Sequence, residues 1–403
     1  MSRSTRSTRT TSGAAVALAA LVLPLAACVD NGAASSSGAG ALTVDSTADA
    51  CDVSAAEAPS GTLTFSVTNS GDDVTEFYLL ADDRLRVVSE VENIGPGLTR
   101  DLVVQVPAGD YYTACKPGMV GDGITAAFTV TDSGEEVGPT GPVAEQLATA
   151  EADYVAYVKD QVGSLVAGTQ QFADAYAAGD DATARDLYAA VRVHWERVEP
   201  VAESFGDLDP LLDAREADLA EGEEWSGWHF IEKDLWQPTP EANGGTAYTA
   251  LTPDERLAAA DTLVELTGEL DARVTADDFT FQAFQISNGA KELLDEVATG
   301  KVTGEEEIWS HTDLWDFRAN VDGAEVALGV LRGVAEAQDA DLVADLDDRF
   351  ATLDDLLAQH GSVDTGFVAY TDLTDAQVAE LAAAVDAVSE PLSRLTSTIT
   401  DAA

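Results

Sequence analysis

Basic residues are scarce in this sequence. Lys and Arg total 21 against 73 Asp and Glu, which gives a formal charge of −52 over 403 residues. Such an acidic chain repels nucleic-acid phosphates and anionic lipid headgroups, so a nucleic-acid-binding function is excluded and cations are the natural partners. Acidity of this kind also serves simply to solvate a surface. A metal site therefore has to be argued from local clusters of residues.

The sequence also lacks an apolar run long enough to cross a membrane as a helix. The run from Ala14 to Ala27 is too short for that, and it follows several arginines in the manner of a secretory signal peptide. It ends in Leu25-Ala26-Ala27-Cys28, which resembles a lipobox. We therefore expect residues 1–28 to be a lipoprotein signal peptide that includes the lipidated Cys28. That lipid would anchor the chain to the cell membrane on its extracytoplasmic face.

Cysteine is rare, with three residues in the whole chain. If Cys28 is lipidated, Cys51 and Cys115 remain as an even pair in an oxidising compartment. A disulfide between these two residues is our first interpretation. Thiolate ligation of a metal ion is the alternative.

Two residue patterns divide the rest of the chain. Residues 29–41 are rich in Gly, Ala and Ser, which predicts a flexible tether. Residues 42–131 alternate apolar and polar side chains, as in Leu63, Phe65 and Val67, and turn signals separate the runs. This pattern predicts a small antiparallel β-sandwich. Residues 132–142 are rich in Gly and Pro and are expected to form a linker.

Residues 143–403 show apolar side chains with helical spacing, as in Leu147, Ala150 and Tyr154. This region is longer than one four-helix bundle requires, so we expect two packed bundles. The predicted fold class is therefore a multidomain β plus all-α protein, in which a small β-sandwich precedes a pair of four-helix bundles.

Histidine is the scarcest candidate metal ligand, with four residues, and its placement is informative. All six tryptophans lie close in sequence to three of these histidines, His194, His229 and His311. Well-packed helix turns, in which indoles fill the core, would explain each cluster by itself. The three clusters together favour a buried polar site between helices.

The clearest local motif is Gly227-Trp228-His229-Phe230-Ile231-Glu232. His229 and Glu232 are three residues apart and therefore project from one face of a helix. Glu196 and Glu199 have the same spacing, and such pairs on facing helices build the iron and manganese sites of bundle proteins. A mixed set of imidazole and carboxylates suits iron, manganese or zinc, and a carboxylate-rich set favours iron over copper.

A zinc-peptidase interpretation of this motif fails on spacing. Zincins need a glutamate directly after the first histidine and a second histidine four residues after it. Phe230 and Lys233 occupy those two positions here. The motif therefore favours metal binding without this form of peptide hydrolysis.

The Gly-x-His-x-x-Glu motif, the string from His194 to Pro200 and the segment from Ser310 to Phe317 resemble the EfeO family of bacterial ferrous-iron uptake components. The helical part resembles the imelysin family, and the resemblance spans residues 42–403. It implies a metal site at the matching positions, which are Glu196, Glu199, Asp213, His229 and Glu232. Only the resemblance points to Asp213. It also implies two partners, an iron permease and a haem peroxidase of the dye-decolourising type.

The sandwich resembles the cupredoxin-like domain of the same family. A type-one copper centre is not expected there, because such centres need two histidines and no histidine precedes His194. Two alternatives remain open. The sandwich holds either no metal or an acidic second metal site, made of Glu76, Glu90, Glu92 and Cys115.

The expected function is an extracytoplasmic iron-binding component that passes iron to a membrane permease, and not an enzyme. The bound ion is expected to be ferrous or ferric iron, with copper and zinc as further candidates. The alternative is a metal-dependent enzyme, either a metallopeptidase or a metal oxidase that assists iron oxidation. A polymer-binding adaptor is a third class, which no sequence feature supports. Turnover of oxygen or peptide by the iron-loaded protein would separate an enzyme from a carrier.

Overall fold

The computed structural model describes residues 41–84, 86–119, 123–134, 137–219, 222–400 and 402, and these belong to one compact unit. The expected signal peptide, Cys28 and most of the expected tether lie outside the described residues. Among the helices of the described part, none is long and apolar enough to cross a membrane.

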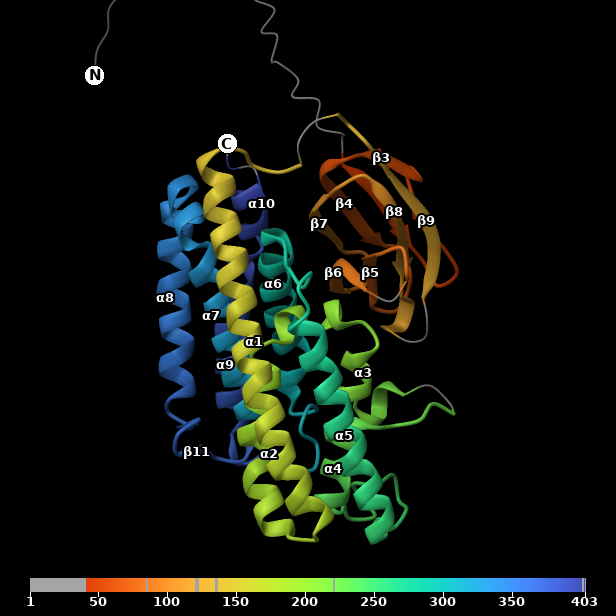
Figure 1. Cartoon of the computed structure of the whole chain (residues 1–403), viewed down its shortest axis with the longest axis vertical. Coiled ribbons are helices and arrows are strands. Elements are labelled where there is room, and N and C mark those ends of the chain that lie inside the picture. Colours follow the sequence, from red (N-terminus) through yellow and green to blue (C-terminus); the bar gives the residue numbers. More distant parts are fainter. Residues whose placement is uncertain are drawn as a thin grey trace, which may run out of the picture. The chain divides into compact units, whose positions relative to one another are not determined.

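The N-terminal part consists of two β-sheets (Figure 1). One has the strand order β2-β1-β4-β7 and the other the order β3-β9-β8-β5-β6, and β1 pairs in parallel with β4. The strands are β1 (Leu42–Ser46), β2 (Cys51–Val53), β3 (Glu57–Pro59), β4 (Gly61–Asn69), β5 (Thr75–Leu80), β6 (Val87–Ile94), β7 (Thr99–Val106), β8 (Gly109–Cys115) and β9 (Ile124–Thr131).

The sheets are held together by an apolar core and a disulfide. Phe65 of β4 contacts Phe77 and Phe128 of the other sheet, with ring centroids 5.2 and 5.4 Å apart. The alternation that predicted β4 buries Leu63, Phe65 and Val67 on one face. Cys51 of β2 and Cys115 of β8 form a disulfide that joins the two sheets, with Cα atoms 5.5 Å apart.

Helices follow the sheets, as the residue pattern predicted. They are α1 (Pro142–Ala177), α2 (Asp181–Glu196), α3 (Leu208–Asp213), α4 (Gly227–Trp236), α5 (Pro253–Val274), α6 (Ala283–Thr299), α7 (Asp313–Gln338), α8 (Ala340–Leu357), α9 (Asp375–Leu392) and α10 (Leu395–Thr400). Short 3-10 turns and a small hairpin lie between the helices: η2 (Glu199–Phe205), η3 (Glu216–Asp218), η4 (Lys301–Thr303), η5 (Tyr370–Asp372), β10 (Gly361–Ser362) and β11 (Gly366–Phe367). A further 3-10 turn, η1 (Pro117–Met119), lies between β8 and β9.

Local sequence sets several of these helix ends. Thr252 and Glu255 form a capping box at the start of α5, in which each side chain bonds the backbone of the other residue. Thr374 and Gln377 do the same at the start of α9. Because these interactions satisfy backbone N–H groups at the first helical turn, both helices begin where the sequence motif places them.

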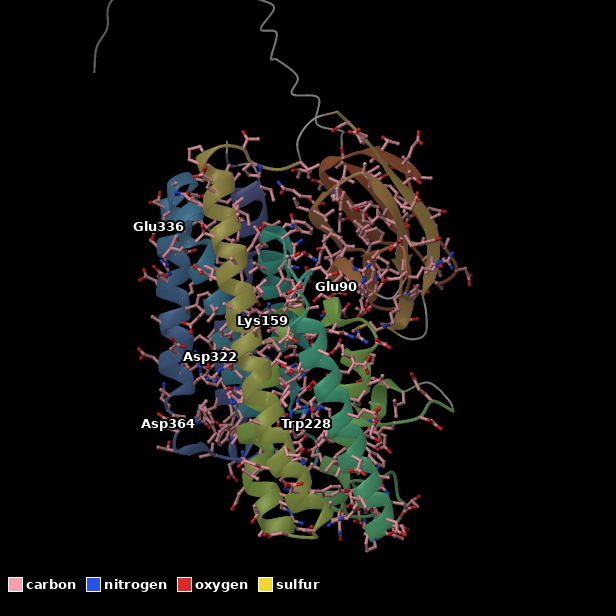
Figure 2. The ribbon with its side chains drawn as sticks, in the orientation of Figure 1. Glu90, Lys159, Trp228, Asp322, Glu336 and Asp364 are labelled. Carbon is pink, nitrogen blue, oxygen red and sulfur yellow. A yellow bond between two sulfur atoms is a disulfide. The ribbon has the colours of Figure 1, made fainter. Side chains whose placement is uncertain are left out.

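The long helices form two groups of four. α1 packs against α2 and α5, with α4 packed against α2 and α5, whereas α6, α7, α8 and α9 pack around one another. α7 also contacts α1 and α2, so the two groups share one continuous core. Trp228 lies in this core, with its ring centroid 5.0 Å from that of Phe172 (Figure 2).

Helix α6 is the helix that contacts the sheets most closely. Phe284 is buried in the core between the strands, and the Asn288 side-chain amide donates hydrogen bonds to Ser89 Oγ and the Val103 carbonyl, both at 2.8 Å. On its other side α6 packs against η2. A Cβ atom on Gly289 would lie 1.6 Å from the Pro200 carbonyl oxygen, so only glycine permits this approach.

Candidate metal centre

The residues of the Gly-x-His-x-x-Glu motif lie on α4, the helix that begins at Gly227. His229 and Glu232 are fully buried on one face of this helix, as their spacing predicts. His229 Nδ1 lies 3.2 Å from Glu232 Oε2. Nδ1 can donate a proton to this carboxylate, so in the neutral imidazole the lone pair is on Nε2.

Glycine at the start of α4 brings a third residue of the candidate site into place. Gly227 has φ 83°, and a Cβ atom there would lie 2.1 Å from the Leu212 carbonyl oxygen near the end of α3. The close approach of the two helices places Asp213, the last residue of α3, beside His229. Asp213 Oδ1 lies 3.5 Å from His229 Nε2.

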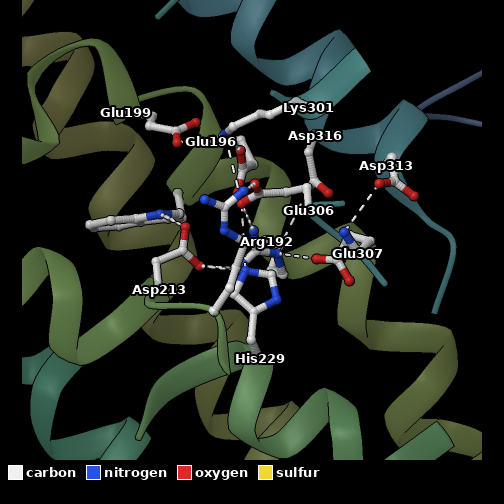
Figure 3. A network of polar contacts seen from close by, with 12 residues as sticks. Arg192, Glu196, Glu199, Asp213, His229, Lys301, Glu306, Glu307, Asp313 and Asp316 are labelled. Atoms are coloured by element: carbon white, nitrogen blue, oxygen red, sulfur yellow. Dashed lines mark hydrogen bonds and ion pairs between the residues drawn. The ribbon is translucent and has the colours of Figure 1, made fainter. Parts of the chain in front are cut away.

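A glutamate that the sequence did not indicate completes this group. Glu306 Oε1 also lies 3.5 Å from His229 Nε2, and it comes from the segment between η4 and α7 (Figure 3). Potential ligand atoms of Asp213, His229 and Glu306 all lie within 4.8 Å of one another. The structure thus brings together one imidazole and two carboxylates, which is a ligand set suited to iron, manganese or zinc.

The neighbouring residue Glu307 was also missed by sequence analysis. Together with His229 and Glu232 it forms a second group of potential ligands within 4.8 Å. Glu232 Oε1 accepts hydrogen bonds from the backbone N–H groups of Trp309 and Ser310, at 3.0 and 2.7 Å. Because these bonds tie the segment after Glu307 to α4, the same glutamate orients His229 and positions the loop.

Arg192 is a fully buried guanidinium at the centre of these carboxylates. It forms ion pairs with Glu196 and Asp213, and its Nε lies 2.8 Å from Glu307 Oε1. A buried carboxylate is costly unless it is paired. In the metal-free protein Arg192 therefore supplies positive charge to these three acids, and it also lies 3.8 Å from Glu306 and 3.7 Å from Asp316.

Glu196 and Glu199 lie beside this group, and other residues hold them. Lys301 Nζ lies 3.2 Å from Glu196 Oε2 and 2.6 Å from Glu199 Oε1. The Asn320 amide donates to the same two carboxylates, at 3.1 and 2.6 Å. Five residues were expected at the metal site. Of these, Asp213 and Glu232 lie beside the imidazole of His229, whereas Glu196 and Glu199 are paired with Lys301.

The charges of the centre favour a protonated histidine in the metal-free protein. Burial and the charge of Arg192 lower the pKa of His229, but hydrogen bonds to Glu232 and Glu306 and the charge of Asp213 outweigh them and raise it well above 6.5. Burial raises the pKa of Glu306, yet Lys301 and the same hydrogen bond to His229 hold it well below 4.5. A metal ion that binds Nε2 must therefore displace a proton.

Glu307 has the opposite shift. Burial and the negative charge of Glu232 raise its pKa well above 4.5, although Arg192 and the Ser310 hydroxyl, which donates to Oε2 at 2.6 Å, favour the carboxylate. Negative charge therefore exceeds positive charge around Glu307, and binding of a cation in this centre would be favourable.

The tryptophans around the centre pack and position it. Trp195 Nε1 donates a 2.7 Å hydrogen bond to Asp213 Oδ2, which leaves Oδ1 facing His229. Trp225 and Trp309 lie with ring centroids 5.9 Å apart, and the Lys233 ammonium lies 5.2 Å from the Trp309 ring. These indoles therefore fix the ligand helices and the loop before α7 without supplying a metal ligand.

The remaining histidines do not join the candidate metal centre. His194 Nδ1 lies 2.9 Å from Gln161 Oε1, and His311 donates its backbone N–H to the Glu307 carbonyl. Lys233, at the position where a zincin has its second histidine, forms an ion pair with Glu216. The arrangement around α4 is thus not that of a zincin.

The acidic set expected in the sheets is changed in two ways. Cys115 is in the disulfide, so its sulfur is not the thiolate that the expected second site required. Glu76 accepts a hydrogen bond from Tyr78 and lies 4.0 Å from Lys116. Glu90 and Glu92 of β6 instead group with Glu203 of η2, which sequence analysis missed, with potential ligand atoms within 4.8 Å of one another.

A β-sheet region followed by a helical region with a buried histidine and carboxylates defines the class of this protein. The model of the Imelysin family, also designated peptidase family M75, matches residues 150–395, and the chain belongs to this family. Among its relatives is the iron uptake system component EfeO of Yersinia pestis, 36% identical over 348 residues, which are 86% of this chain and 87% of that protein. The component of the same name from Escherichia coli strain K12 is 33% identical over 344 residues, or 83% of this chain and 85% of the other.

Proposed function

We propose that this protein is the extracytoplasmic iron-binding component of a ferrous-iron uptake system, which captures iron and delivers it to a membrane permease. The observation that carries the proposal is the buried group of Asp213, His229 and Glu306, in which an imidazole Nε2 faces two carboxylates. The printed names of the Yersinia and Escherichia relatives, iron uptake system component EfeO, support the choice of iron.

The ligand set suits transfer of iron as well as its capture. Iron accepts both imidazole nitrogen and carboxylate oxygen, and neutral His229 with two carboxylates would balance a divalent ion. Arg192 and Lys301 remain close by and pair with the carboxylates when the ion leaves. These internal cations limit the affinity, so a permease can take the ion over.

The proposal includes the location and the partners of the protein. Lipidation at Cys28 would hold it on the extracytoplasmic face of the cell membrane, and Cys28→Ala should release it or leave it unprocessed. The partners would be an iron permease and a haem peroxidase of the dye-decolourising type. Membrane retention of the Cys28→Ala variant on detergent partition would contradict the anchor.

A metal-dependent enzyme is the second candidate, because the matching family model carries a peptidase designation. Against it, Phe230 and Lys233 stand where a zincin needs its catalytic glutamate and second histidine. Purified metal-free protein should be titrated under anaerobic conditions with ferrous iron, then in separate samples with ferric, cupric and zinc ions. Stoichiometric iron binding without oxygen consumption or peptide cleavage supports the carrier, and multiple turnovers with either substrate would refute it.

The acidic group of Glu90, Glu92 and Glu203 is proposed as a second, weaker metal position of the carrier. Burial and the charge of Glu203 raise the pKa of Glu90 well above 4.5, and burial and neighbouring acids do the same for the pKa of Glu92. A bound cation would relieve this repulsion. Glu203→Gln would then remove weak binding while the site at His229 keeps its affinity. Equal metal stoichiometry and affinity in Glu203→Gln and wild type would show that this acidic group binds no metal.

A further inference from the structure

One face of α7 carries buried oxygens that the site described above does not use. Asp313, Asp316 and Asn320 are spaced i, i+3 and i+7 and therefore line one face of the helix. Their exposed fractions are 2%, 1% and 0%. Asp316 Oδ1 and Oδ2, Asp313 Oδ2 and Asn320 Oδ1 have no hydrogen-bond partner among the described residues.

Asp316 is the residue of this face with the least compensation. Within the described residues its one ion pair is with Arg192, whose Nε lies 3.7 Å from Oδ1. Three other carboxylates share that guanidinium: its Nη atoms pair with Glu196 and Asp213, and its Nε lies 2.8 Å from Glu307 Oε1 without the geometry of a hydrogen bond. A buried carboxylate without hydrogen bonds is unfavourable, so a cation or a proton is needed at Asp316.

Further oxygen ligands are available near Asp316. The Asn320 carboxamide, one helical turn along α7, donates from its nitrogen to Glu196 Oε2 at 3.1 Å, while its Oδ1 has no hydrogen-bond partner among the described residues. Glu196 is also the neighbouring acid whose charge acts most strongly on Asp316. These three side chains offer oxygen without nitrogen or sulfur, which is the ligand set that hard divalent ions prefer.

The charge balance of the whole centre also leaves room for a second ion. Its seven carboxyl groups meet three cations, Arg192, Lys301 and Arg215, the last of which lies 3.4 Å from Glu306. The carboxyl groups are those of Glu196, Glu199, Asp213, Glu232, Glu306, Glu307 and Asp316. With all seven ionised, one divalent ion bound to a neutral His229 leaves two negative charges unbalanced, and a second ion leaves none.

We propose that the helical domain binds two cations, and that Asp316, Asn320 Oδ1 and Glu196 form the second position, an oxygen-only site for a hard divalent ion. This inference rests on the proposed function, because it takes the group around His229 as the first position. The second position would hold Fe²⁺ during uptake through oxygen ligands alone. Arg192 contacts a ligand of each position and would keep the two ions apart.

The test is to count bound ions in wild type and in single variants, with Mn²⁺ as the probe for the oxygen site. Metal-free full-length protein is titrated with Mn²⁺ and, anaerobically, with Fe²⁺, and bound metal is measured after removal of excess. Not counting the weak binding that Glu203→Gln removes, two ions per chain are expected in wild type and one in Asp316→Asn, whose amide has nearly the same shape. His229→Ala should also retain one ion, the one at Asp316.

Asp322→Asn is the matched control on the same helix, because Asp322 pairs with Arg197 and Arg318 outside the centre (Figure 2). It should keep two ions. The Mn²⁺ electron paramagnetic resonance spectrum of wild type gives a measurement that needs no variant: two neighbouring ions broaden it, and a single isolated Mn²⁺ spectrum at saturation would overturn the proposal.

The outcomes separate this inference from the function it rests on. One ion in wild type, or two ions in Asp316→Asn, refutes the second position and leaves the carrier intact. Two Mn²⁺ with no Fe²⁺ bound refutes the iron carrier and leaves the two positions intact. Loss of one ion in Asp316→Asn, with unchanged binding of the other, supports the assignment.

Discussion

The His229 imidazole and the Glu232 carboxylate lie one helical turn apart, with Nδ1 3.2 Å from Oε2, and both side chains are fully buried. Glu232 uses its second oxygen to accept two backbone N–H groups from the loop before α7. A single glutamate therefore sets the tautomer of the histidine and the position of the loop that carries Glu306. The pair predicts different outcomes for substitutions of its two members.

His229→Ala should lower iron affinity by more than tenfold, about 1.4 kcal/mol or more, because it removes the only nitrogen ligand of the first position. Alanine is a strong helix former, so α4 should persist. The measurement is anaerobic isothermal titration with Fe²⁺, and circular dichroism checks the fold. His360→Ala, outside the centre, is the control, and equal affinities in the two variants would remove His229 from the site.

Glu232→Gln keeps the shape of the side chain and can still accept the two N–H groups of the loop. It loses the negative charge that favours a proton on Nδ1, so the imidazole should become a weaker metal ligand. We expect a loss of affinity of roughly tenfold or more, within the range seen when outer-shell partners of metal ligands are changed. Glu232→Ala should lose more, since the loop is freed as well. An unchanged affinity in both variants would contradict the orienting role.

Iron binding should strengthen as the pH rises. The pKa of His229 is raised well above 6.5, so a proton leaves Nε2 on metal binding, and the logarithm of the affinity should rise by about one per pH unit below that pKa. The free energy of unfolding of the metal-free protein should instead fall as the pH rises. The raised pKa of His229 stabilises the folded protein fully below the unfolded-state pKa of 6.5, and this stabilisation is lost as the pH rises through the folded-state pKa.

Glu307 contributes to stability with the same pH dependence. Its pKa is raised above the unfolded-state value of 4.5, so its contribution to the free energy of unfolding is also lost as the pH rises. Melting curves of metal-free and iron-loaded protein between about pH 6 and about pH 8 test both statements. The thermal shift on adding iron should increase over that interval. A shift that is constant with pH would show that no proton is released.

Arg192→Met should destabilise the metal-free protein by about 3–5 kcal/mol, because removing one partner leaves buried carboxylates unpaired. The same change removes a cation that competes with the metal, so saturating Mn²⁺ should raise the melting temperature of the variant more than that of wild type. Thermal unfolding with and without Mn²⁺ measures both effects. Arg332→Met, which breaks a surface pair with Asp347, is the control and should change little.

Opening the disulfide should destabilise the sheets and leave the helical site intact. Cys51 and Cys115 are 64 residues apart, for which the chain-entropy model gives about 4 kcal/mol of stabilisation. The double variant Cys51→Ala and Cys115→Ala should therefore unfold earlier, with unchanged iron affinity at His229. Thiol titration of unfolded, unreduced wild type should find neither thiol free, and two free thiols would refute the disulfide.

Local spacing predicted the parts of the centre that lie on one helix. His229 and Glu232 could be paired from the sequence because three residues of helix place them on one face. Asp213 depended on a resemblance to known proteins, since its position is set by the approach of α3 to Gly227, which no local pattern expresses.

Glu306 and Glu307 could not be found in this way. The loop that carries them reaches α4 through two backbone N–H groups that donate to the Glu232 carboxylate, 77 and 78 positions away in the chain. Nothing in the spacing of Glu306 and Glu307 marks them among 73 acidic residues. Arg192 was overlooked for a related reason. A lone arginine in an amphipathic helix is normally expected at the surface, and only the carboxylates gathered by the tertiary fold make its burial favourable.

The contact of Gly289 with the Pro200 carbonyl gives η2 a mechanical role. Seated without a spacer on the backbone of α6, this short turn has little freedom to slide, and it carries Glu199 toward the helical centre and Glu203 toward β6. Both acids therefore belong to one short turn that packs closely on α6. A bulkier residue at position 289 would push η2 away from α6 and displace Glu199 and Glu203 together.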